Sequence, residues 1–320
     1  SEENAKAIPN FEYKIELTDN EPVFVRNYKQ RLDVIKALEE QVKSLIKAGI
    51  VEKNEGLTQY NLPTVAIKKP SGAIRLCLDA RKINAKIRPC YTFLDNLNYS
   101  IDKAMQCKGK YFTTLDLFEA FYSVQLAPES RDIVSFTLPS GSYRFCRLIM
   151  GLATSPAIFC KLMNNIFRDD ENVSLYLDDI ILANEDFKSH LKQIKSTLEK
   201  LRNNNLRVNG KKAAIMRTSV NFLGFTLSAK GCAPRDDKIK AILTLKEPES
   251  VTQLRSLIGS FSYYRRFVVN YSGLISPLTK LLRKNVPFVF DSECKKAFES
   301  LKQAFKSPLI LRNFTVGEPV

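Results

Sequence analysis

The stretch Ser174-Leu175-Tyr176-Leu177-Asp178-Asp179-Ile180-Ile181-Leu182 places two adjacent aspartates between two short runs of apolar, β-prone residues. The length and period of these runs predict two strands in a tight hairpin joined at Asp178-Asp179. Aspartate suits a hairpin tip because it tolerates the left-handed backbone conformation. The pair is therefore either a solvated turn or part of a metal site. Two carboxylates at a rigid tip repel each other unless a cation lies between them, and hard oxygen ligands select Mg²⁺ or Mn²⁺.

The composition is that of a globular protein with several packed units: 320 residues, 44% hydrophobic and 26% charged. Seven cysteines form no C-x-x-C pair and the chain has one histidine, which argues against a zinc site and suits a reducing intracellular compartment. No apolar run reaches the roughly 18 residues of a membrane span, and the N-terminus has no secretory pattern, so we expect no membrane partner. Because the first residue is Ser1, we expect a segment cut from a longer product.

The net charge of +15 comes entirely from the second half of the chain. Residues 1–185 contain 24 Lys and Arg against 24 Asp and Glu, whereas residues 186–320 contain 25 against 10. A neutral front half and a basic back half favour a polyanion such as nucleic acid, held by the back half. The alternative is a basic surface that serves only solubility.

The N-terminal third predicts an extended arm, a helix and a hairpin. Residues 1–30 show no clear period, and apolar residues at helical spacing follow over 32–46, with Gly49 as the stop. Residues 65–81 predict a hairpin around a Pro-Ser-Gly turn. We expect four cations to cluster at that turn, either as a solvated surface or as a triphosphate clamp: Lys68, Lys69, Arg75 and Arg81.

The middle of the chain predicts a strand over 111–117 that contains a carboxylate near its end. A buried carboxylate is costly without a partner or a metal, so Asp116 requires a physical reason. A hairpin over 136–145 follows, and Ser155-Pro156 predicts a helix that starts with a serine N-cap. We expect residues 149–154, just ahead of that helix, to line a nucleotide pocket.

The remainder predicts mainly helices. One predicted helix has its apolar face at 187, 191, 194, 198 and 201, and we expect His190 beside this face, on the surface. Residues 222–225 predict a short strand. From 234 onward we expect helices separated by prolines, including one over 251–264 with Arg255, Arg265 and Arg266 off its apolar face. Gly259 and Ser262 on that helix allow either close approach to a duplex groove or ordinary helix packing. The last helix is expected over 292–306.

Together these stretches resemble a reverse transcriptase, and most closely the polymerase of gypsy-like LTR retrotransposons (the Metaviridae). The resemblance covers residues 25–312 and rests on seven motifs in the family's order. In this sequence the motifs are 62–84, Leu115-Asp116-Leu117, Met150-Gly151-Leu152-Ala153-Thr154-Ser155-Pro156-Ala157, Tyr176-Leu177-Asp178-Asp179, Lys211-Lys212, Phe222-Leu223-Gly224, and 254–259 with Tyr263-Tyr264-Arg265-Arg266-Phe267.

The resemblance implies an α+β right-hand polymerase fold of fingers, palm and thumb, with an antiparallel palm sheet backed by helices. It implies interleaved fingers and palm over 31–232 and a helical thumb over 233–312, after the N-terminal arm. In the family an RNase H domain follows the thumb, so the tail at 313–320 lies where that domain would begin, and we expect no RNase H activity. The family commonly has Pro-Phe-Gly where this chain has Ile149-Met150-Gly151.

The resemblance also supplies the third acid, Asp116, which would join Asp178 and Asp179, with Leu117 alongside, in binding two Mg²⁺ ions (or Mn²⁺) about 3.5–4 Å apart. The nucleotide site it implies consists of Lys69, Arg75, Glu119, Ala120, Phe121, Met150, Gly151, Lys211 and Lys212. Phe121 would exclude a 2′-hydroxyl, and one of the two lysines would protonate pyrophosphate. Its nucleic-acid contacts are Arg81, Tyr176, Leu177, Phe222, Leu223, Gly224, Arg255, Gly259, Arg265 and Arg266.

The implied activity is RNA- and DNA-templated DNA synthesis, with dNTPs and a primer–template (RNA–DNA hybrid or DNA duplex) as partners. The alternative is a domesticated, non-catalytic nucleic-acid-binding protein. Another two-metal palm enzyme, such as a nucleotidyl cyclase, would have no use for the primer grip that Phe222-Leu223-Gly224 resembles or for a basic thumb. We expect a cytoplasmic location within virus-like particles, or a nuclear one if the chain is domesticated. The oligomeric state stays open, a homodimer included.

Overall fold

The structure is a computed structural model that describes residues 6–56, 58–68, 72, 74–90, 97–106 and 109–306. The chain forms two compact units, which we treat separately. The first unit consists of Ser1–Ser100, Leu115–Ile180 and Lys192–Ala213, and the second of Ile101–Thr114, Ile181–Leu191 and Ala214–Val320. No helix in the described ranges is long and apolar enough to cross a membrane.

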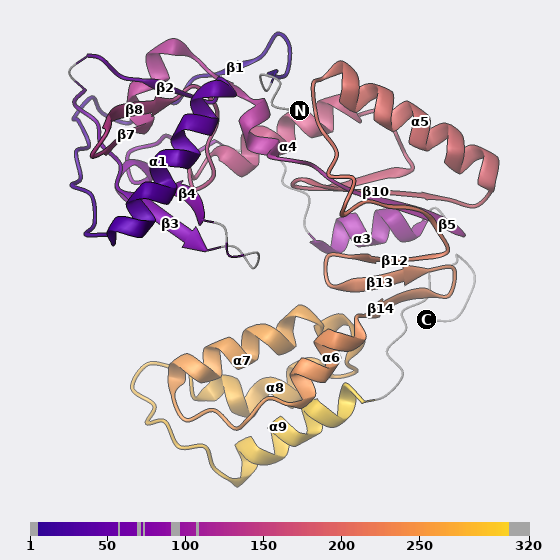
Figure 1. Cartoon of the computed structure of the whole chain (residues 1–320). Helices are drawn as coiled ribbons and strands as arrows, with labels where there is room; N and C mark the ends of the chain where they lie inside the picture. The colour runs from indigo at the N-terminus through magenta and orange to yellow at the C-terminus, as the bar shows by residue number, and fades with distance from the viewer. Residues whose placement is uncertain are drawn as a thin grey trace. The chain divides into compact units, whose positions relative to one another are not determined.

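The N-terminal part of the first unit is built from short strands and one long helix (Figure 1). The helix α1 (Leu32–Lys47) buries Leu38, Val42 and Leu45, and Gly49 follows at φ +67°, as the stop signal predicts. The antiparallel hairpin β3 (Thr64–Lys68) and β4 (Ile74–Leu78) confirms the predicted hairpin. A second sheet has the order β2-β8-β7, with β2 at Val51–Lys53, β7 at Ser135–Leu138 and β8 at Gly141–Phe145.

The N-terminal segment is extended, as predicted, but it is not a free arm. Its strand β1 (Glu12–Tyr13) pairs in parallel with β6 (Gln125–Leu126). Ile8, Ile15 and Val23 are buried. Their apolar side chains therefore fix the segment to the unit by removing its surface from water.

A four-stranded sheet has the order β11-β5-β10-β9 and positions the acidic residues. Its strands are β5 (Tyr111–Asp116), β9 (Val173–Tyr176), β10 (Asp179–Asn184) and β11 (Ala214–Arg217), and β5 and β10 contribute residues to both units. β10 lies between β5 and β9, and four of its consecutive residues, from Ile180 to Ala183, are buried. This run is apolar without alternation because both faces of the strand are covered.

The helices α4 (Ser155–Ile166) and α5 (Phe187–Asn203) lie within a few residues of their predicted positions. The sequence patterns did not predict α2 (Arg81–Asn84), α3 (Leu97–Gln106) or the 3-10 turns at Ala120–Ser123, Pro128–Ser130 and Asp132–Val134. The N-cap of α4 is Thr154 rather than Ser155, whose hydroxyl donates instead to the carbonyl of Ile149 at 2.6 Å.

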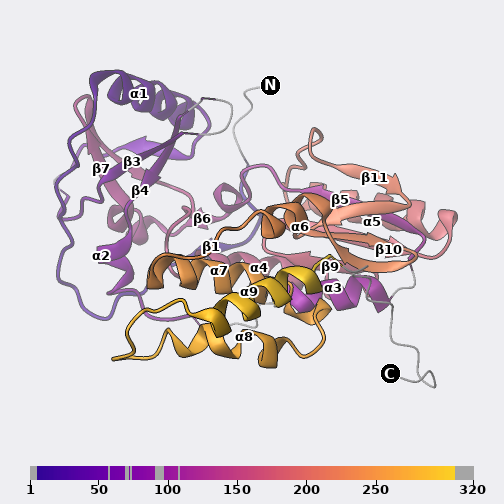
Figure 2. The same cartoon turned by 90° about the horizontal axis from the view of Figure 1, so that it is seen from below.

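The described C-terminal part of the second unit contains the sheet β12-β13-β14 (Figure 1), followed by the helices from 236 onward (Figure 2). The strands are β12 (Ser219–Phe222), β13 (Phe225–Ser228) and β14 (Gly231–Pro234). The helices are α6 (Asp236–Leu243), α7 (Val251–Tyr263), α8 (Tyr271–Lys280) and α9 (Ser292–Ala304), with a 3-10 turn at Arg265–Phe267. The prediction that prolines separate these helices is wrong at Pro277, which lies inside α8.

The predicted surface position of His190 is also wrong. Its side chain is fully buried, and its two ring nitrogens lie 2.8 Å from Thr113 Oγ1 and 2.7 Å from Asn184 Oδ1. The buried face of α5 runs through 190, 194, 197 and 201, whereas Leu191 and Leu198 are largely exposed. The apolar pattern alone missed this face because a polar side chain with two hydrogen-bond partners can be buried at little cost.

Candidate functional site

Three aspartates from distant parts of the sequence meet where β5 ends and β10 begins. Asp116 is the last residue of β5, Asp179 is the first of β10, and the two strands are neighbours in the sheet. The amide of Leu117 donates to the carbonyl oxygen of Asp178 at 3.2 Å, which joins the two segments at this end. The structure thus brings together the strand-borne acid and the hairpin acids.

The tip of the hairpin differs from the prediction by one residue. The chain reverses at Leu177-Asp178, and Leu177 adopts the left-handed conformation at φ +55°, while Asp179 already belongs to β10. Pairing of β10 within the sheet includes Asp179 in the strand, so the left-handed position is occupied by a leucine at a conformational cost. Tyr176 ends β9 just before this turn.

Partial burial and mutual repulsion raise the pKa values of the hairpin acids. Burial raises the pKa of Asp179 to about 6, and the negative charges of Asp178 and Asp116 add to the effect. The pKa of Asp178 is raised mainly by burial and further by Asp116, whereas Lys212 lowers it. Three like charges in one partly desolvated place make a site that favours a bound cation.

The donor chemistry of this cluster fits divalent magnesium or manganese. Its side chains offer carboxylate oxygens only, and hard cations of this class prefer such ligands. Over the described ranges, no group of three or more His, Cys, Asp or Glu side chains is arranged so that it could hold a metal ion, and the three aspartates are no exception. Leu117 is buried, and its backbone forms an isolated β-bridge with Val208. A contact between Leu117 and a metal ion stays a prediction.

One of the two predicted lysines reaches the cluster. The ammonium of Lys212 lies 3.0 Å from Asp116 Oδ2, and the amide of Asn209 donates to the Asp116 carbonyl at 2.8 Å. Lys211 is exposed and forms no ion pair with any described residue. The structure therefore distinguishes two lysines that the sequence left equivalent.

The turn after β5 presents backbone and an aromatic ring. Glu119 is left-handed at φ +51°, Ala120 is buried, and the Phe121 ring packs against Phe159 with centroids 5.4 Å apart. Arg207, which the sequence did not single out, contributes its carbonyl to the Phe118 amide and places its guanidinium 3.8 Å from Glu119. Its isolated position in the sequence gave no signal.

Residues of the predicted nucleotide pocket meet at a second place in the first unit. Arg75 Nη1 lies 3.8 Å from the sulfur of Met150. The side chain of Asn84 donates to the Gly151 carbonyl and accepts from the Ala153 amide, each at 2.8 Å, so it fixes the loop before α4 from both sides. Lys69 lies outside the described residues.

The prediction that Arg81 belongs to the hairpin-turn cluster is wrong. Arg81 begins α2, beyond the opposite end of β4, and its guanidinium forms a bidentate pair with Asp79, the closest distance being 2.6 Å. That pairing and the hydroxyl of Tyr28 hold the pKa of Asp79 well below its usual range. The side chain of Arg81 remains 82% exposed, so it is available to a ligand.

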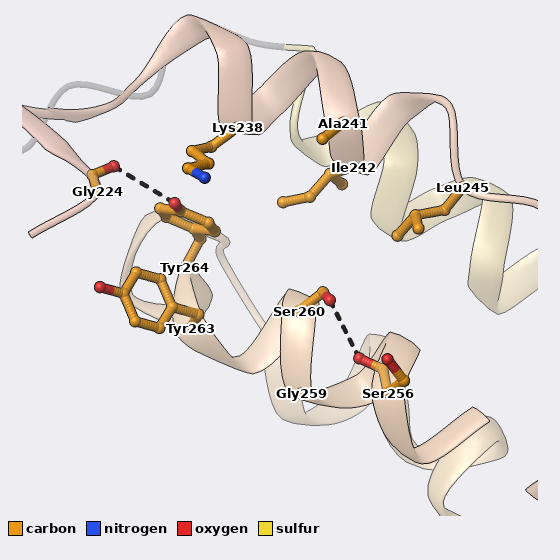
Figure 3. Close-up of a pocket in the computed structure, with 10 residues that line it drawn as sticks. All are labelled: Gly224, Lys238, Ala241, Ile242, Leu245, Ser256, Gly259, Ser260, Tyr263 and Tyr264. Atoms are coloured by element: carbon orange, nitrogen blue, oxygen red, sulfur yellow. Dashed lines mark hydrogen bonds between the residues drawn. The ribbon is translucent and has the colours of Figure 1, made fainter. Parts of the chain in front are cut away.

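In the second unit, Phe222-Leu223-Gly224 is a hairpin end and not the predicted strand. Phe222 closes β12, and Leu223 and Gly224 turn the chain into β13. The turn lies beside a cavity of about 590 Å³ between α6 and α7, which Figure 3 shows. Its lining residues are Gly224, Lys238, Ala241, Ile242, Leu245, Ser256, Gly259, Ser260, Tyr263 and Tyr264.

The predicted thumb cations differ in their surroundings. Arg255 lies on α7 and is exposed, and Gly259 lines the cavity from the same helix. Arg265 and Arg266 belong to the 3-10 turn after α7 and not to the helix itself. Arg266 is 2.6 Å from Asp102, and this ion pair limits its availability to a phosphate.

The reverse transcriptase (RNA-dependent DNA polymerase) family model matches residues 67–227, about half of the chain, including all three aspartates. The chain belongs to the reverse transcriptase family. Among related proteins, this reverse transcriptase chain is 34% identical over 310 residues to the retrovirus-related Pol polyprotein from transposon 412 of Drosophila melanogaster, with 94% of this chain and 25% of that protein aligned. It is 32% identical to the Pol polyprotein from transposon gypsy of the same organism, with 94% and 30% aligned.

Solved structures agree with this assignment. The foamy viral protease–reverse transcriptase in complex with double-stranded DNA is 25% identical, with a TM-score of 0.88 over 97% of this chain and 54% of that chain. The same viral enzyme with an RNA/DNA hybrid gives a TM-score of 0.83. This reverse transcriptase chain therefore has the right-hand polymerase fold, with mixed helices and antiparallel sheets. It spans about a quarter to a third of the length of the transposon polyproteins that it matches.

Proposed function

We propose that this reverse transcriptase chain extends a primer 3′-hydroxyl with dNTPs, using RNA or DNA as template. The observation that supports this most directly is the meeting of Asp116, Asp178 and Asp179 at one end of the sheet, where burial and like charge raise the pKa values of the last two. Such an excess of negative charge destabilises a fold, so its presence in a reverse transcriptase indicates cation-dependent chemistry.

The three aspartates would hold two Mg²⁺ or Mn²⁺ ions. When bound, such ions lower the pKa of an attacking hydroxyl and stabilise the charge on the leaving pyrophosphate. The protein supplies the position: β5 and β10 are neighbouring strands, and the Leu117–Asp178 backbone hydrogen bond fixes their separation. Preorganised charge of this kind costs no rearrangement at the moment of reaction.

Lys212 is our candidate for the residue that protonates pyrophosphate. Its ammonium lies 3.0 Å from Asp116 and its side chain is 64% exposed, so the ammonium can leave the carboxylate when a cation neutralises that charge. A lysine that reaches the acidic cluster lies close enough to transfer a proton to the leaving group, and a lysine without such a contact does not. Lys211 has no comparable contact with the residues that the structure describes.

The nucleotide would lie between the backbone after β5 and the cations of the β3–β4 hairpin. Arg75, with Lys69, would bind the triphosphate, and the backbone amides of Glu119 and Ala120 would bind it from the other side. Phe121 is fixed by Phe159, so its ring can act as a rigid steric barrier against a ribose 2′-hydroxyl. Discrimination by such a barrier needs a ring that cannot move aside.

The nucleic-acid partners we propose are RNA–DNA hybrid and DNA duplex. The similar foamy viral enzyme has been solved in complex with both kinds of duplex. In this chain the net charge of +15 comes from residues 186–320, which include Arg255 and Arg265. Contacts of these cations with phosphates would release counterions, so binding should weaken steeply with salt.

Primer extension on poly(rA)/oligo(dT) with Mg²⁺ tests the proposal. The wild-type chain should incorporate dTTP, and Asp178→Asn should abolish incorporation while leaving hybrid binding within about threefold, because it removes one charge and almost no surface. Asp169→Asn is the matched control, since this carboxylate is exposed and lies outside the cluster. A wild-type chain that binds hybrid but incorporates nothing would refute catalysis and support a nucleic-acid-binding role.

A further inference from the structure

The turn between β12 and β13 has a backbone conformation that its sequence does not favour. Phe222 pairs with Phe225, and the two residues between them have φ +48° (Leu223) and +80° (Gly224). Two positive φ values in a two-residue hairpin define a type I′ turn, for which Asn-Gly is the preferred pair. Leucine is disfavoured there because its Cβ crowds the backbone. The turn therefore gains from contacts outside the hairpin.

Two adjacent tyrosines at the end of α7 provide such contacts. The hydroxyl of Tyr263 donates to the carbonyl of Leu223 at 2.7 Å, and the hydroxyl of Tyr264 donates to the carbonyl of Gly224 at 3.3 Å. Figure 3 shows the phenol of Tyr264 directed at Gly224. Both carbonyls of the turn thus accept a hydrogen bond from a hydroxyl at one helix end, 40 residues along the chain, and the Gly224 carbonyl also accepts from the Arg235 amide at 3.2 Å. Each bond fixes the orientation of one peptide unit.

The rings of the same tyrosines pack against the first residue of β13. Phe225 is fully buried, and its ring centroid lies 5.5 Å from that of Tyr263 and 5.4 Å from that of Tyr264. A Cβ added to Gly224 would lie 3.2 Å from the Tyr264 hydroxyl and 3.3 Å from the Tyr263 ring. Only glycine allows both the backbone conformation and this close approach.

We propose that Tyr263 and Tyr264 are positioning residues for the primer strand: they bind the Leu223-Gly224 turn to the end of α7, so that turn and helix act as one rigid body. This inference rests on the proposed function, primer extension, together with the nucleic-acid contact that the family resemblance implies for Leu223 and Gly224. With its carbonyls held on the α7 side, the turn presents a fixed backbone surface to the primer. A turn without these bonds would sample other conformations, so the conformation that binds the primer would be less populated.

Tyr263→Phe and Tyr264→Phe, singly and together, test the proposal. Phenylalanine keeps the rings on Phe225 and the cavity wall and removes the hydroxyls that donate to the turn carbonyls. The control is Tyr271→Phe, which removes a phenol hydroxyl that contacts Ser262 at 2.9 Å in the same unit and away from the turn. Melting temperatures of all variants measure the general structural cost.

We expect the KM for primer–template to rise about 3- to 10-fold in Tyr263→Phe, and further in the double variant, with the KM for dNTP unchanged. For Tyr271→Phe, the only change that we expect is a lower melting temperature, with both KM values unchanged. An unchanged primer–template KM in the double variant would overturn the proposal. An equal rise in Tyr271→Phe would also overturn it, because the effect would then be general destabilisation.

Two measurements keep the result separate from that of the proposed function. Amide hydrogen exchange over residues 219–228 of the free protein should become faster in the double variant and not in Tyr271→Phe. The Kd for a labelled RNA–DNA hybrid, from fluorescence anisotropy, should rise in parallel with the KM. If the wild-type chain proves inactive, the positioning role is still supported when the exchange rate and the Kd both rise in the double variant and not in Tyr271→Phe. An unchanged exchange rate and an unchanged Kd in the double variant refute it.

Discussion

Replacing Asp179 by asparagine should stabilise the protein while abolishing primer extension. In the folded chain this carboxyl is partly buried and close to Asp178 and Asp116, and its pKa is raised to about 6. Ionising this carboxyl at neutral pH therefore costs more free energy in the folded state than in the unfolded state, which lowers the stability of the fold. Asparagine keeps the shape of the side chain and removes the charge.

The magnitude follows from the size of the pKa shift. A rise from 3.8 to about 6 corresponds to roughly 3 kcal/mol at neutral pH. Because the carboxyl is only partly buried, solvent screening reduces the expected gain to about 1–2 kcal/mol. For a chain of this size such a gain raises the melting temperature by about 1.5–3 °C. The folded state binds the proton more tightly than the unfolded state, so wild-type stability falls as pH rises from about 4 to about 6.

Thermal unfolding of wild type and Asp179→Asn at pH 7.5 and pH 5 measures this effect. The difference should be largest at pH 7.5 and about half as large at pH 5, where the folded carboxyl is mostly protonated. Added Mg²⁺ should raise the melting temperature of wild type more than that of the variant, because the variant lacks a ligand. Asp169→Asn should change stability by less than about 0.5 kcal/mol at either pH. A destabilised Asp179→Asn, or a gain that does not depend on pH, would refute the electrostatic reasoning.

Three further predictions concern single residues. Phe121→Ala should admit ribonucleotides, measured as the ratio of kcat/KM for dNTP and rNTP, and unchanged sugar discrimination would remove the steric role. Lys212→Gln should lower the single-turnover incorporation rate at least about tenfold, whereas Lys211→Gln should change it little; equal effects would contradict the assignment from the Asp116 contact. His190→Ala should cost about 2–4 kcal/mol in chemical denaturation, since it removes two buried hydrogen bonds and leaves a cavity; a cost below 1 kcal/mol would show that the site relaxes or fills with water.

The order of the elements could be predicted from local chemistry. Period-two and period-3.6 patterns located the hairpins at 65–81 and 136–145 and the helices that begin near 32, 155 and 251, and motif order indicated the family. Local patterns are informative here because strands, turns and helix ends depend mostly on residues within one or two turns of each other.

Several local predictions failed where a distant contact outweighed the pattern. Leucine at 177 and at 223 occupies a left-handed position because pairing and tyrosine hydrogen bonds compensate its cost. His190 is buried because Thr113 and Asn184 reach it from two strands. None of these partners is recognisable from sequence spacing, since each depends on packing between segments far apart in the chain.

The sequence by itself determined which acids, cations and aromatic residues are present and the succession of strands, turns and helices that contains them. Only the tertiary structure decided that Asp116 ends beside Asp178 and Asp179, that Lys212 rather than Lys211 reaches Asp116, and that a helix end holds the Leu223-Gly224 turn. The reason is physical: pairing of β5 with β10 and burial of side chains between segments set these distances, and no local preference encodes the distance between residues 62 positions apart.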